Sequence, residues 1–159
     1  MNEQVVLITG ALTGIGRAAA VAFAKKGAKV VVSGRRDEAG KALVEELRSF
    51  GSEAEFINAD VRKEDDVRVL VDKTVARFDR LDVAVNNAAT EGAVGPTDTG
   101  MLTRFTGTAE NKAALAAQVP LGRLGFSEEV ADGIVFIASN DARFITGHIL
   151  NVDGGHSAN

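Results

Sequence analysis

A glycine-rich turn near the N-terminus is the part of the sequence best suited to binding a ligand. The turn, Thr9–Gly16, follows an apolar run at Val5–Thr9 and leads into a helical pattern. Glycines let a backbone turn sharply and approach a diphosphate, whose charge the free N–H groups and dipole of a following helix favour. The position between a strand and a helix favours a nucleotide site over a purely structural turn. The candidate cofactor-binding residues of this turn are Gly10, Leu12, Thr13, Gly14, Ile15 and Gly16.

Two arginines after the second apolar run indicate which dinucleotide binds. A site for NAD usually has an acidic residue about 20 residues beyond the glycines, where it hydrogen-bonds the 2′-hydroxyl of the adenosine ribose. This sequence instead has Arg35 and Arg36 directly after Gly34. A guanidinium can donate two parallel hydrogen bonds to a phosphate. Arg35 and Arg36 therefore predict NADP rather than NAD as the cofactor, with a solvated basic turn as the alternative.

Apolar runs alternate with helical patterns over the first half of the chain. The expected strands are Val5–Thr9, Val30–Val32, Glu55–Ala59 and Asp82–Asn86, and the apolar stripes of the expected helices run from Ile15 to Phe23, Leu43 to Phe50 and Val67 to Phe78. This alternation predicts an α/β fold in three layers, with a doubly wound parallel sheet between helices. A continuous apolar run is typical of a strand buried on both faces, so we expect Val5–Thr9 to be central.

The second half of the chain has a different pattern. No periodicity is sustained from Asn87 to Gly107, which predicts a long loop. Helices are expected at Ala109–Val119 and after Ser127, a good N-cap residue, and a last strand at Ile149–Val152. No linker or repeat divides the sequence. We therefore expect residues 1–159 to form a single dinucleotide-binding domain.

The composition narrows the class of protein. Of the 159 residues, 45% are hydrophobic and 25% are charged, as in a globular domain. The net charge of −4 predicts no basic surface for nucleic acid or an anionic membrane, and no apolar stretch approaches the roughly 20 residues of a transmembrane helix. The absence of cysteine is typical of a reducing compartment. We expect no nucleic-acid partner, no membrane partner and a cytoplasmic location.

The remaining polar residues suggest structural roles. His148 and His156 have no companions at metal-ligand spacing, so no metal site is predicted. The mixed charge cluster Lys63–Asp66 is expected to be a solvated helix start.

Together with the glycine turn, several later motifs resemble the short-chain dehydrogenase/reductase family. The glycine spacing is T-G-x-x-x-G-I-G, and Asn86–Ala89 is similar to the family's N-N-A-G, with alanine in place of the glycine. Thr146-Gly147 and Val152–Gly155 resemble its C-terminal signature. The resemblance implies a Rossmann-like fold and an NAD(P)-dependent oxidoreductase. It also implies contacts to the adenine from Asp60 and Val61, and to the cofactor from Asn87 and Ala88.

The middle third of the family's pattern has no counterpart in the sequence. The family's chemistry uses a serine that orients the carbonyl and a Tyr-x-x-x-Lys pair that transfers the proton, whereas this chain has no tyrosine. Gly95–Thr99 resembles the loop after the family's sixth strand, written P-G-x-x-x-T, so the loops after strands four and six are joined near Gly95-Pro96. The resemblance then implies contacts from Thr97 and Thr99 to the nicotinamide and pyrophosphate, no catalytic residue, and a shortened sheet of order 3-2-1-4-7.

Three functions remain open from the sequence. The first is an NADP-dependent oxidoreductase that acts on a small-molecule carbonyl or alcohol and of which this chain lacks the middle, so that the chain itself is catalytically incompetent. The second is a non-catalytic dinucleotide-binding module. The third is a structural or interaction protein with a residual Rossmann fold. In each case the sheet edges and apolar faces left uncovered favour a homo-oligomer.

Overall fold

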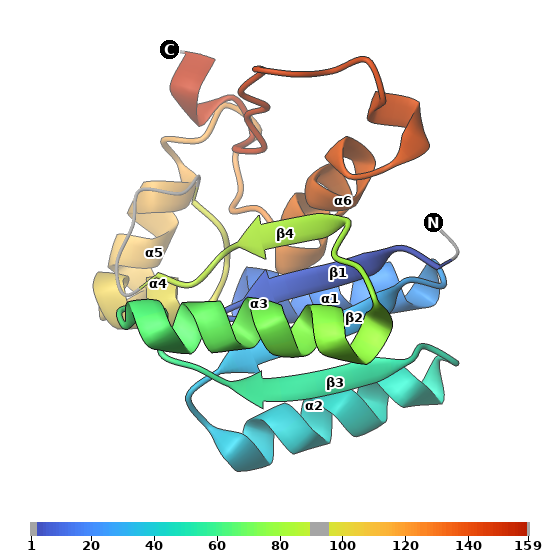
Figure 1. Cartoon of the computed structure of the whole chain (residues 1–159). Coiled ribbons are helices and arrows are strands. Elements are labelled where there is room, and N and C mark those ends of the chain that lie inside the picture. The colour runs from blue at the N-terminus through green and yellow to red at the C-terminus, as the bar shows by residue number, and fades with distance from the viewer. Residues whose placement is uncertain (1–2, 90–95, 159) are drawn as a thin grey trace. The chain divides into compact units, whose positions relative to one another are not determined.

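The chain folds into two compact units. The computed structural model describes residues 3–89 and 96–158, and the units cover Met1–Ala89 and Thr90–Asn159. The first unit holds the described sheet, and the second is built from helices and irregular segments (Figure 1). That the two units form one domain stays a prediction.

The first unit contains a four-stranded parallel sheet in the order β3-β2-β1-β4. The strands are β1 (Val5–Thr9), β2 (Lys29–Gly34), β3 (Ala54–Asn58) and β4 (Val83–Asn86). Thr9, at the end of β1, lies beside Ser33 of β2 and Asn86 of β4. The carboxyl ends of the strands therefore meet at one edge of the sheet. The chain adds β2 and β3 on one side of β1 and then β4 on the other side, and α/β sheets usually bind ligands at such a change of direction.

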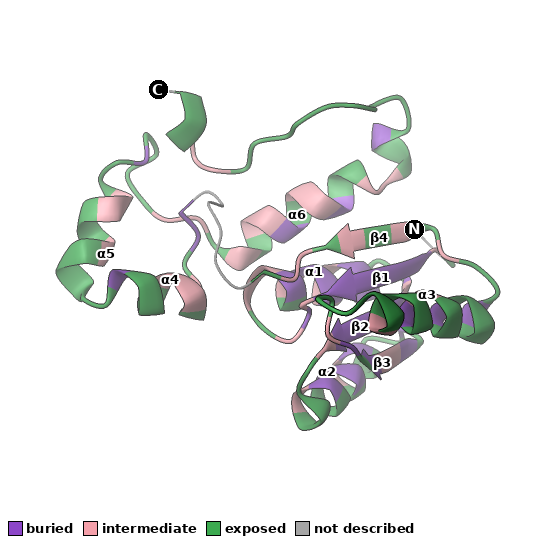
Figure 2. Cartoon of the chain, turned by 60° about the vertical axis from the view of Figure 1, so that its left-hand side comes forward, coloured by how far each residue is buried: buried purple, intermediate pink, exposed green. Residues whose placement is uncertain are grey.

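Helices cover both faces of this sheet. α1 (Gly14–Lys25) and α2 (Asp37–Ser49) lie on one face and α3 (Glu64–Phe78) on the other (Figure 1). All of β1 and the middle of β2 are buried (Figure 2), and Leu7, Val31 and Leu70 share a core cluster on the α3 side. Burying one such side chain contributes about 1.5–3 kcal/mol. The predicted α/β fold with a parallel sheet is confirmed, with Val5–Thr9 as an interior strand.

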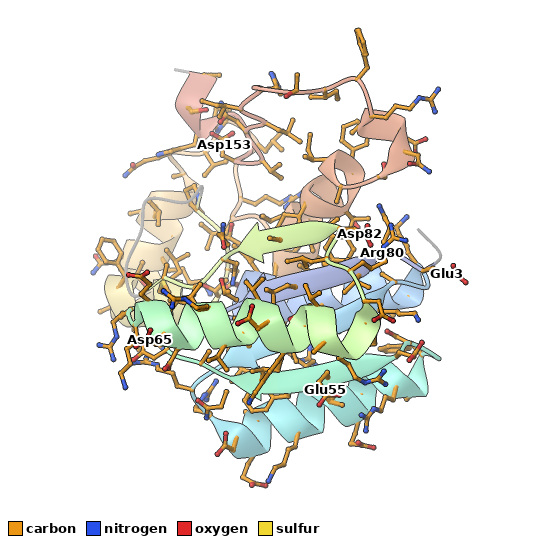
Figure 3. The ribbon with its side chains drawn as sticks, in the orientation of Figure 1. Glu3, Glu55, Asp65, Arg80, Asp82 and Asp153 are labelled. Carbon is orange, nitrogen blue, oxygen red and sulfur yellow. The ribbon has the colours of Figure 1, made fainter. Side chains whose placement is uncertain are left out.

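A carboxylate fixes the start of β1. Asp82 Oδ2 accepts a hydrogen bond from the Val5 N–H at 2.8 Å, while Asp82 Oδ1 accepts from Arg80 Nη2 at 2.6 Å. Figure 3 labels Arg80 and Asp82, which lie side by side before β4. The hydrogen bond from Arg80, assisted by that from Val5, holds the pKa of Asp82 below its ordinary value of 3.8. Asp82 thus links the residue before β4 to the first residue of β1.

The second unit contains short helices, one of which the sequence did not predict. The helices are α4 (Gly100–Thr106), α5 (Ala109–Ala116), α6 (Ser127–Ile137) and the 3-10 turns η1 (Asn140–Ala142) and η2 (His156–Ala158). The expectation of a loop up to Gly107 is wrong, because α4 lies within it. Only Thr106 of α4 is buried, so its two turns show no apolar stripe. The Thr99 hydroxyl stabilises α4 by accepting the Leu102 N–H at 3.3 Å.

α6 begins one residue earlier than the sequence predicts. Ser127, expected as the N-cap, is the first helical residue, and Phe126 holds the cap position. The Phe126 N–H donates to Glu129 Oε2 at 2.7 Å. Hydrogen bonds from Arg123 and from this N–H lower the pKa of Glu129 to about 2. The Glu129 carboxylate in the first turn therefore accepts the N–H of the N-cap residue, whereas the sequence predicted a serine hydroxyl as the cap.

The strand expected at Ile149–Val152 does not form. Residues 148–152 have no regular secondary structure, and the sheet of described residues has four strands instead of the five in the order 3-2-1-4-7. None of the backbone N–H or C=O groups of residues 148–152 bonds to another described residue. Strand propensity mostly reflects packing against a neighbouring strand, so this apolar segment stays irregular without one.

We expect Asp82→Asn to lower the free energy of unfolding by about 1 kcal/mol at neutral pH, because the charge-assisted bonds to Val5 and Arg80 weaken. A folded-state pKa below 3.8 means that this contribution is present above that pH and is lost as the pH falls through the lowered value. Urea unfolding at a series of pH values measures it. Asp72→Asn is the control, since Asp72 is exposed on α3 and bonds to no other described residue. Equal effects of the two variants would contradict the assignment.

Candidate functional site

The turn between β1 and α1 brings most of the predicted cofactor residues together. Gly10 and Gly14 have φ values of +65° and +55°, in the left-handed region that favours glycine. A Cβ atom on Gly10 would lie 2.7 Å from the Cα of Ala88. The residues that follow β4 therefore pack directly against the turn, and the turn tolerates no side chain at Gly10.

The Asn87 side chain holds this turn in place. Asn87 Nδ2 donates to the backbone oxygens of Thr9 at 3.2 Å and Gly10 at 3.1 Å. A Cβ atom on Gly16 would overlap the Asn87 amide and the Gly10 oxygen. Gly16 thus leaves room for the amide, and both of its protons are used within the protein. In this structure Asn87, predicted as a cofactor contact, is a residue that positions the turn.

A second side chain, which sequence reasoning missed, completes this junction. The Thr9 hydroxyl donates to the Val85 oxygen at 3.4 Å and accepts the N–H groups of Asn87 and Ala88, each at 3.2 Å. It therefore satisfies backbone groups where β4 ends. The signal in the sequence is a threonine at the last position of an otherwise apolar central strand.

The first turn of α1 suits an anion better than the first turns of α2 and α3. It has no acidic residue, whereas α2 and α3 begin with two and three. Thr13 at the N-cap position is exposed and makes no capping hydrogen bond, and Ile15 lies half-buried in the same turn. A phosphate at this end could accept the N–H groups that the helix leaves without partners and interact favourably with its dipole.

Arg35 and Arg36 lie directly after β2, beside the glycine turn. A Cβ atom on Gly34 would lie 2.6 Å from Leu12 Cδ1, so the turn packs against the end of β2 through Leu12. Both arginines are exposed, and neither forms an ion pair within residues 3–89 or 96–158. The next acid in the sequence, Asp37, accepts a hydrogen bond from Asn58 Nδ2 at 2.5 Å.

Asp60 and Val61 follow β3 at the same edge of the sheet. Arg62 forms a fork with Asp60, from Nε to Oδ1 at 2.9 Å and from Nη2 to Oδ2 at 2.5 Å. These hydrogen bonds lower the pKa of Asp60, and the charge of Arg35 contributes to the shift. Asp66 Oδ2 accepts the Asp60 N–H at 2.9 Å. Lys63–Asp66 is the expected helix start, with its first three residues exposed, while Asp66 is half-buried and also holds the Asp60 N–H. Val61 is 40% exposed.

Thr97 and Thr99 belong to the second unit. Thr97 is buried, forms a parallel bridge with Gly125, and lines a cavity of about 210 Å³ together with Val130 and Val152. The Thr99 hydroxyl is used to cap α4. Asp153, labelled in Figure 3, also lines this cavity and accepts the N–H groups of Gly155 and Ser157. The expected junction at Gly95-Pro96 falls at the end of residues 90–95, which lie outside the described residues.

The described residues offer neither a membrane-spanning helix nor a cluster of metal ligands. No helix there is both long and apolar enough to cross a membrane. In the same part of the chain, no three or more His, Cys, Asp or Glu residues come close enough to hold a metal ion.

Comparison with known families agrees with the geometry of the glycine turn. The sequence profile of the short chain dehydrogenases matches residues 4–114, and that of an enoyl-(acyl carrier protein) reductase family matches residues 93–157. The chain belongs to the short-chain dehydrogenase family.

The relatives of this chain differ in how much of their own length it covers. An uncharacterized oxidoreductase of Thermotoga maritima is 31% identical over 252 aligned positions, which take in 99% of this chain and 100% of that protein. This alignment is longer than the 159-residue chain, so more than a third of its positions face gaps in the chain. A 3beta-hydroxysteroid dehydrogenase of Mediterraneibacter gnavus is 45% identical over 92 residues, 58% of this chain and 33% of that protein. The chain thus covers only about a third of the second relative.

A solved structure shares the fold of this chain. The crystal structure of an actinorhodin polyketide ketoreductase with NADPH superposes with a TM-score of 0.90. The match has 22% sequence identity and covers 98% of this chain and 99% of that one. At this identity the likeness supports the Rossmann-like fold.

We expect Asn87→Asp to destabilise the first unit by about 2–3 kcal/mol, because a carboxylate would face the Thr9 and Gly10 oxygens without a proton to donate. Urea unfolding followed by circular dichroism measures the change. Asn86→Asp adds the same charge one residue earlier, at an exposed side chain that bonds to no other described residue, and should change stability little. A similar loss in both variants would show that charge, rather than the lost donor, is responsible.

Proposed function

We propose that this chain binds NADP(H) along the carboxyl edge of the sheet, with the diphosphate at the β1–α1 turn and the adenosine 2′-phosphate at Arg35. The observation that carries the proposal is the uncapped, acid-free start of α1, flanked by glycines at positive φ. Backbone N–H groups in this arrangement bind phosphate without any side chain. When bound, the cofactor supplies a hydride from its nicotinamide ring.

The charges around the turn support NADP over NAD. Arg35 and Arg36 are exposed, without an ion-pair partner in the described part of the chain, and follow the strand against which Leu12 packs. An acid at this position would hydrogen-bond the ribose hydroxyl of NAD and repel the phosphate of NADP. The next acid, Asp37, is engaged by Asn58. Arg62 neutralises Asp60 and so lowers the repulsion that a nearby phosphate would meet.

We further propose that these 159 residues do not by themselves carry out hydride transfer between a carbonyl and an alcohol. The family's proton donor is a tyrosine assisted by lysine, and the sequence has no tyrosine. The alignment with the Thermotoga maritima relative takes in 252 positions against the 159 residues of this chain, so the chain is the shorter of the two. A small-molecule carbonyl or alcohol is therefore the substrate class of the complete family pattern, and this chain keeps the cofactor half of it.

A dinucleotide-binding module is favoured over a purely structural protein for a specific reason. A structural helix start gains from acids in its first turn, as in α2 and α3. α1 has no acid there. The N-terminus of α1 therefore has no negative side chain that would repel a bound anion.

Arg35→Ala should weaken NADP(H) binding by about 10–100-fold, which corresponds to one charge-assisted phosphate contact of roughly 1.5–3 kcal/mol. NAD(H) has no 2′-phosphate, so its affinity should change little. Isothermal titration calorimetry with both cofactors measures this, and Arg68→Ala is a control because Arg68 is exposed and pairs with Glu64 within α3. Equal affinities of the parent chain for NADP(H) and NAD(H) would refute the preference.

The chain should show no more than trace oxidation of NADPH with ketones or aldehydes, because general acid–base catalysis is typically worth 10²–10⁴-fold. The absorbance of NADPH, followed over time, measures turnover, and intact mass spectrometry must confirm the 16.6 kDa species. Saturable NADPH binding without turnover is the expected result. Robust turnover by the verified chain would overturn the proposal on catalysis and leave the one on binding intact.

A further inference from the structure

Arg35 and Asp60 follow neighbouring strands at the carboxyl edge of the sheet. Gly34, the last residue of β2, lies beside Asn58, the last residue of β3, and the Ala59 N–H donates to the Gly34 oxygen at 3.2 Å. Arg35 comes next after Gly34, and Asp60 comes next after Ala59. Two opposite charges therefore lie where the two strands end, close enough for the charge of Arg35 to act on Asp60.

The Asp60 carboxylate nevertheless pairs with Arg62. Besides the two bonds of the fork, Arg62 Nε donates to Oδ2 at 3.0 Å and the Arg62 backbone N–H donates to Oδ1 at 3.2 Å. The side chain of Asp60 is only 14% exposed, and its backbone is held by Asp66. The hydrogen bonds from Arg62, together with the charge of Arg35, keep the pKa of Asp60 below its ordinary value of 3.8. Asp60 is therefore ionised at neutral pH, fixed in place and in need of a cation.

Arg35 has no such pairing. Its side chain is exposed and forms no hydrogen bond or ion pair with another residue of the ranges 3–89 and 96–158. Asp37, the first acid after β2, accepts a hydrogen bond from Asn58 Nδ2 at 2.5 Å. A guanidinium outside any ion pair offers all of its N–H groups to an anionic ligand, whereas a paired one must first give up its carboxylate. The choice of partner by Asp60 therefore decides whether Arg35 is available.

We propose that Arg62 is a positioning residue for the cofactor site: by occupying the Asp60 carboxylate, it leaves Arg35 available to the 2′-phosphate of NADP(H). Among the described residues, Arg35 is the other cation whose charge acts on Asp60. Without Arg62, the carboxylate would draw Arg35 into an ion pair across the ends of β2 and β3, and its charge would repel the phosphate. The inference rests on the proposed function and adds a residue on which the preference for NADP over NAD depends.

A double-mutant cycle, read by calorimetry as the ratio of NADP(H) to NAD(H) affinity, tests this coupling. The ratio cancels any loss of a contact that both cofactors share. Arg62→Ala should lower the ratio by roughly three- to tenfold, less than Arg35→Ala, because Arg35 is diverted instead of removed. Adding Asp60→Asn removes the acid that diverts it and should restore the ratio to within about twofold. Arg62→Lys, which keeps a charge beside Asp60, should retain most of the ratio.

Arg68→Ala is the matched control for the loss of an exposed ion pair. The Arg68 side chain pairs with Glu64 and is 65% exposed, against 69% for that of Arg62. This variant should leave the ratio of the two affinities unchanged.

The motion of the Arg35 side chain tests the pairing without any cofactor. Nitrogen-15 relaxation of its Nε–Hε group should give an order parameter below about 0.6 in the parent chain, a higher one in Arg62→Ala and a low one again in the double variant. A ratio that Arg62→Ala leaves unchanged overturns the proposal, as does a loss that Asp60→Asn fails to restore. Binding of neither cofactor by the parent chain would refute the proposed function. The order parameters then still decide this inference, since an Arg35 that stays equally mobile in Arg62→Ala overturns it.

Discussion

Two side chains, Thr9 and Asn87, tie the end of β4 to the end of β1 and to the glycine turn that follows it. The hydroxyl satisfies three backbone groups and the amide two, all at the point where the sheet ends. Unpaired backbone groups there would cost about 1–3 kcal/mol each if buried. Because the amide occupies the space above Gly16, a larger residue at that position would displace it and open the turn. The glycines thus serve the protein's own packing as well as the approach of a ligand.

Features that depend on local periodicity could be read from the sequence. The apolar run at Val5–Thr9 is an interior strand, and the arginines after Gly34 stand at the carboxyl edge of the sheet, as expected. Features that depend on contacts distant in sequence could not be. The hydrogen bond between Asp37 and Asn58 spans 21 residues, and that between Asn87 and Gly10 spans 77. No local sequence pattern predicts either of them.

The errors have a common physical cause. α4 is stabilised by a hydroxyl cap and buries almost nothing, so the apolar periodicity that reveals other helices is missing. At Ile149–Val152 the opposite holds, since the side-chain pattern of a strand is present but no described strand lies beside it. A hydrophobic pattern reports which side chains can be buried, whereas a strand also needs a backbone partner that its own sequence does not contain.

The candidate site separates binding from chemistry along the chain. The proposed phosphate recognition would use backbone N–H groups, glycines and a nearby guanidinium, all within the first unit, whose core includes β1. Proton transfer in this family uses the phenol of a tyrosine, and this sequence contains no tyrosine. Under the proposal, the residues that would hold the dinucleotide do not depend on the family's tyrosine and lysine, so binding can be measured separately from turnover.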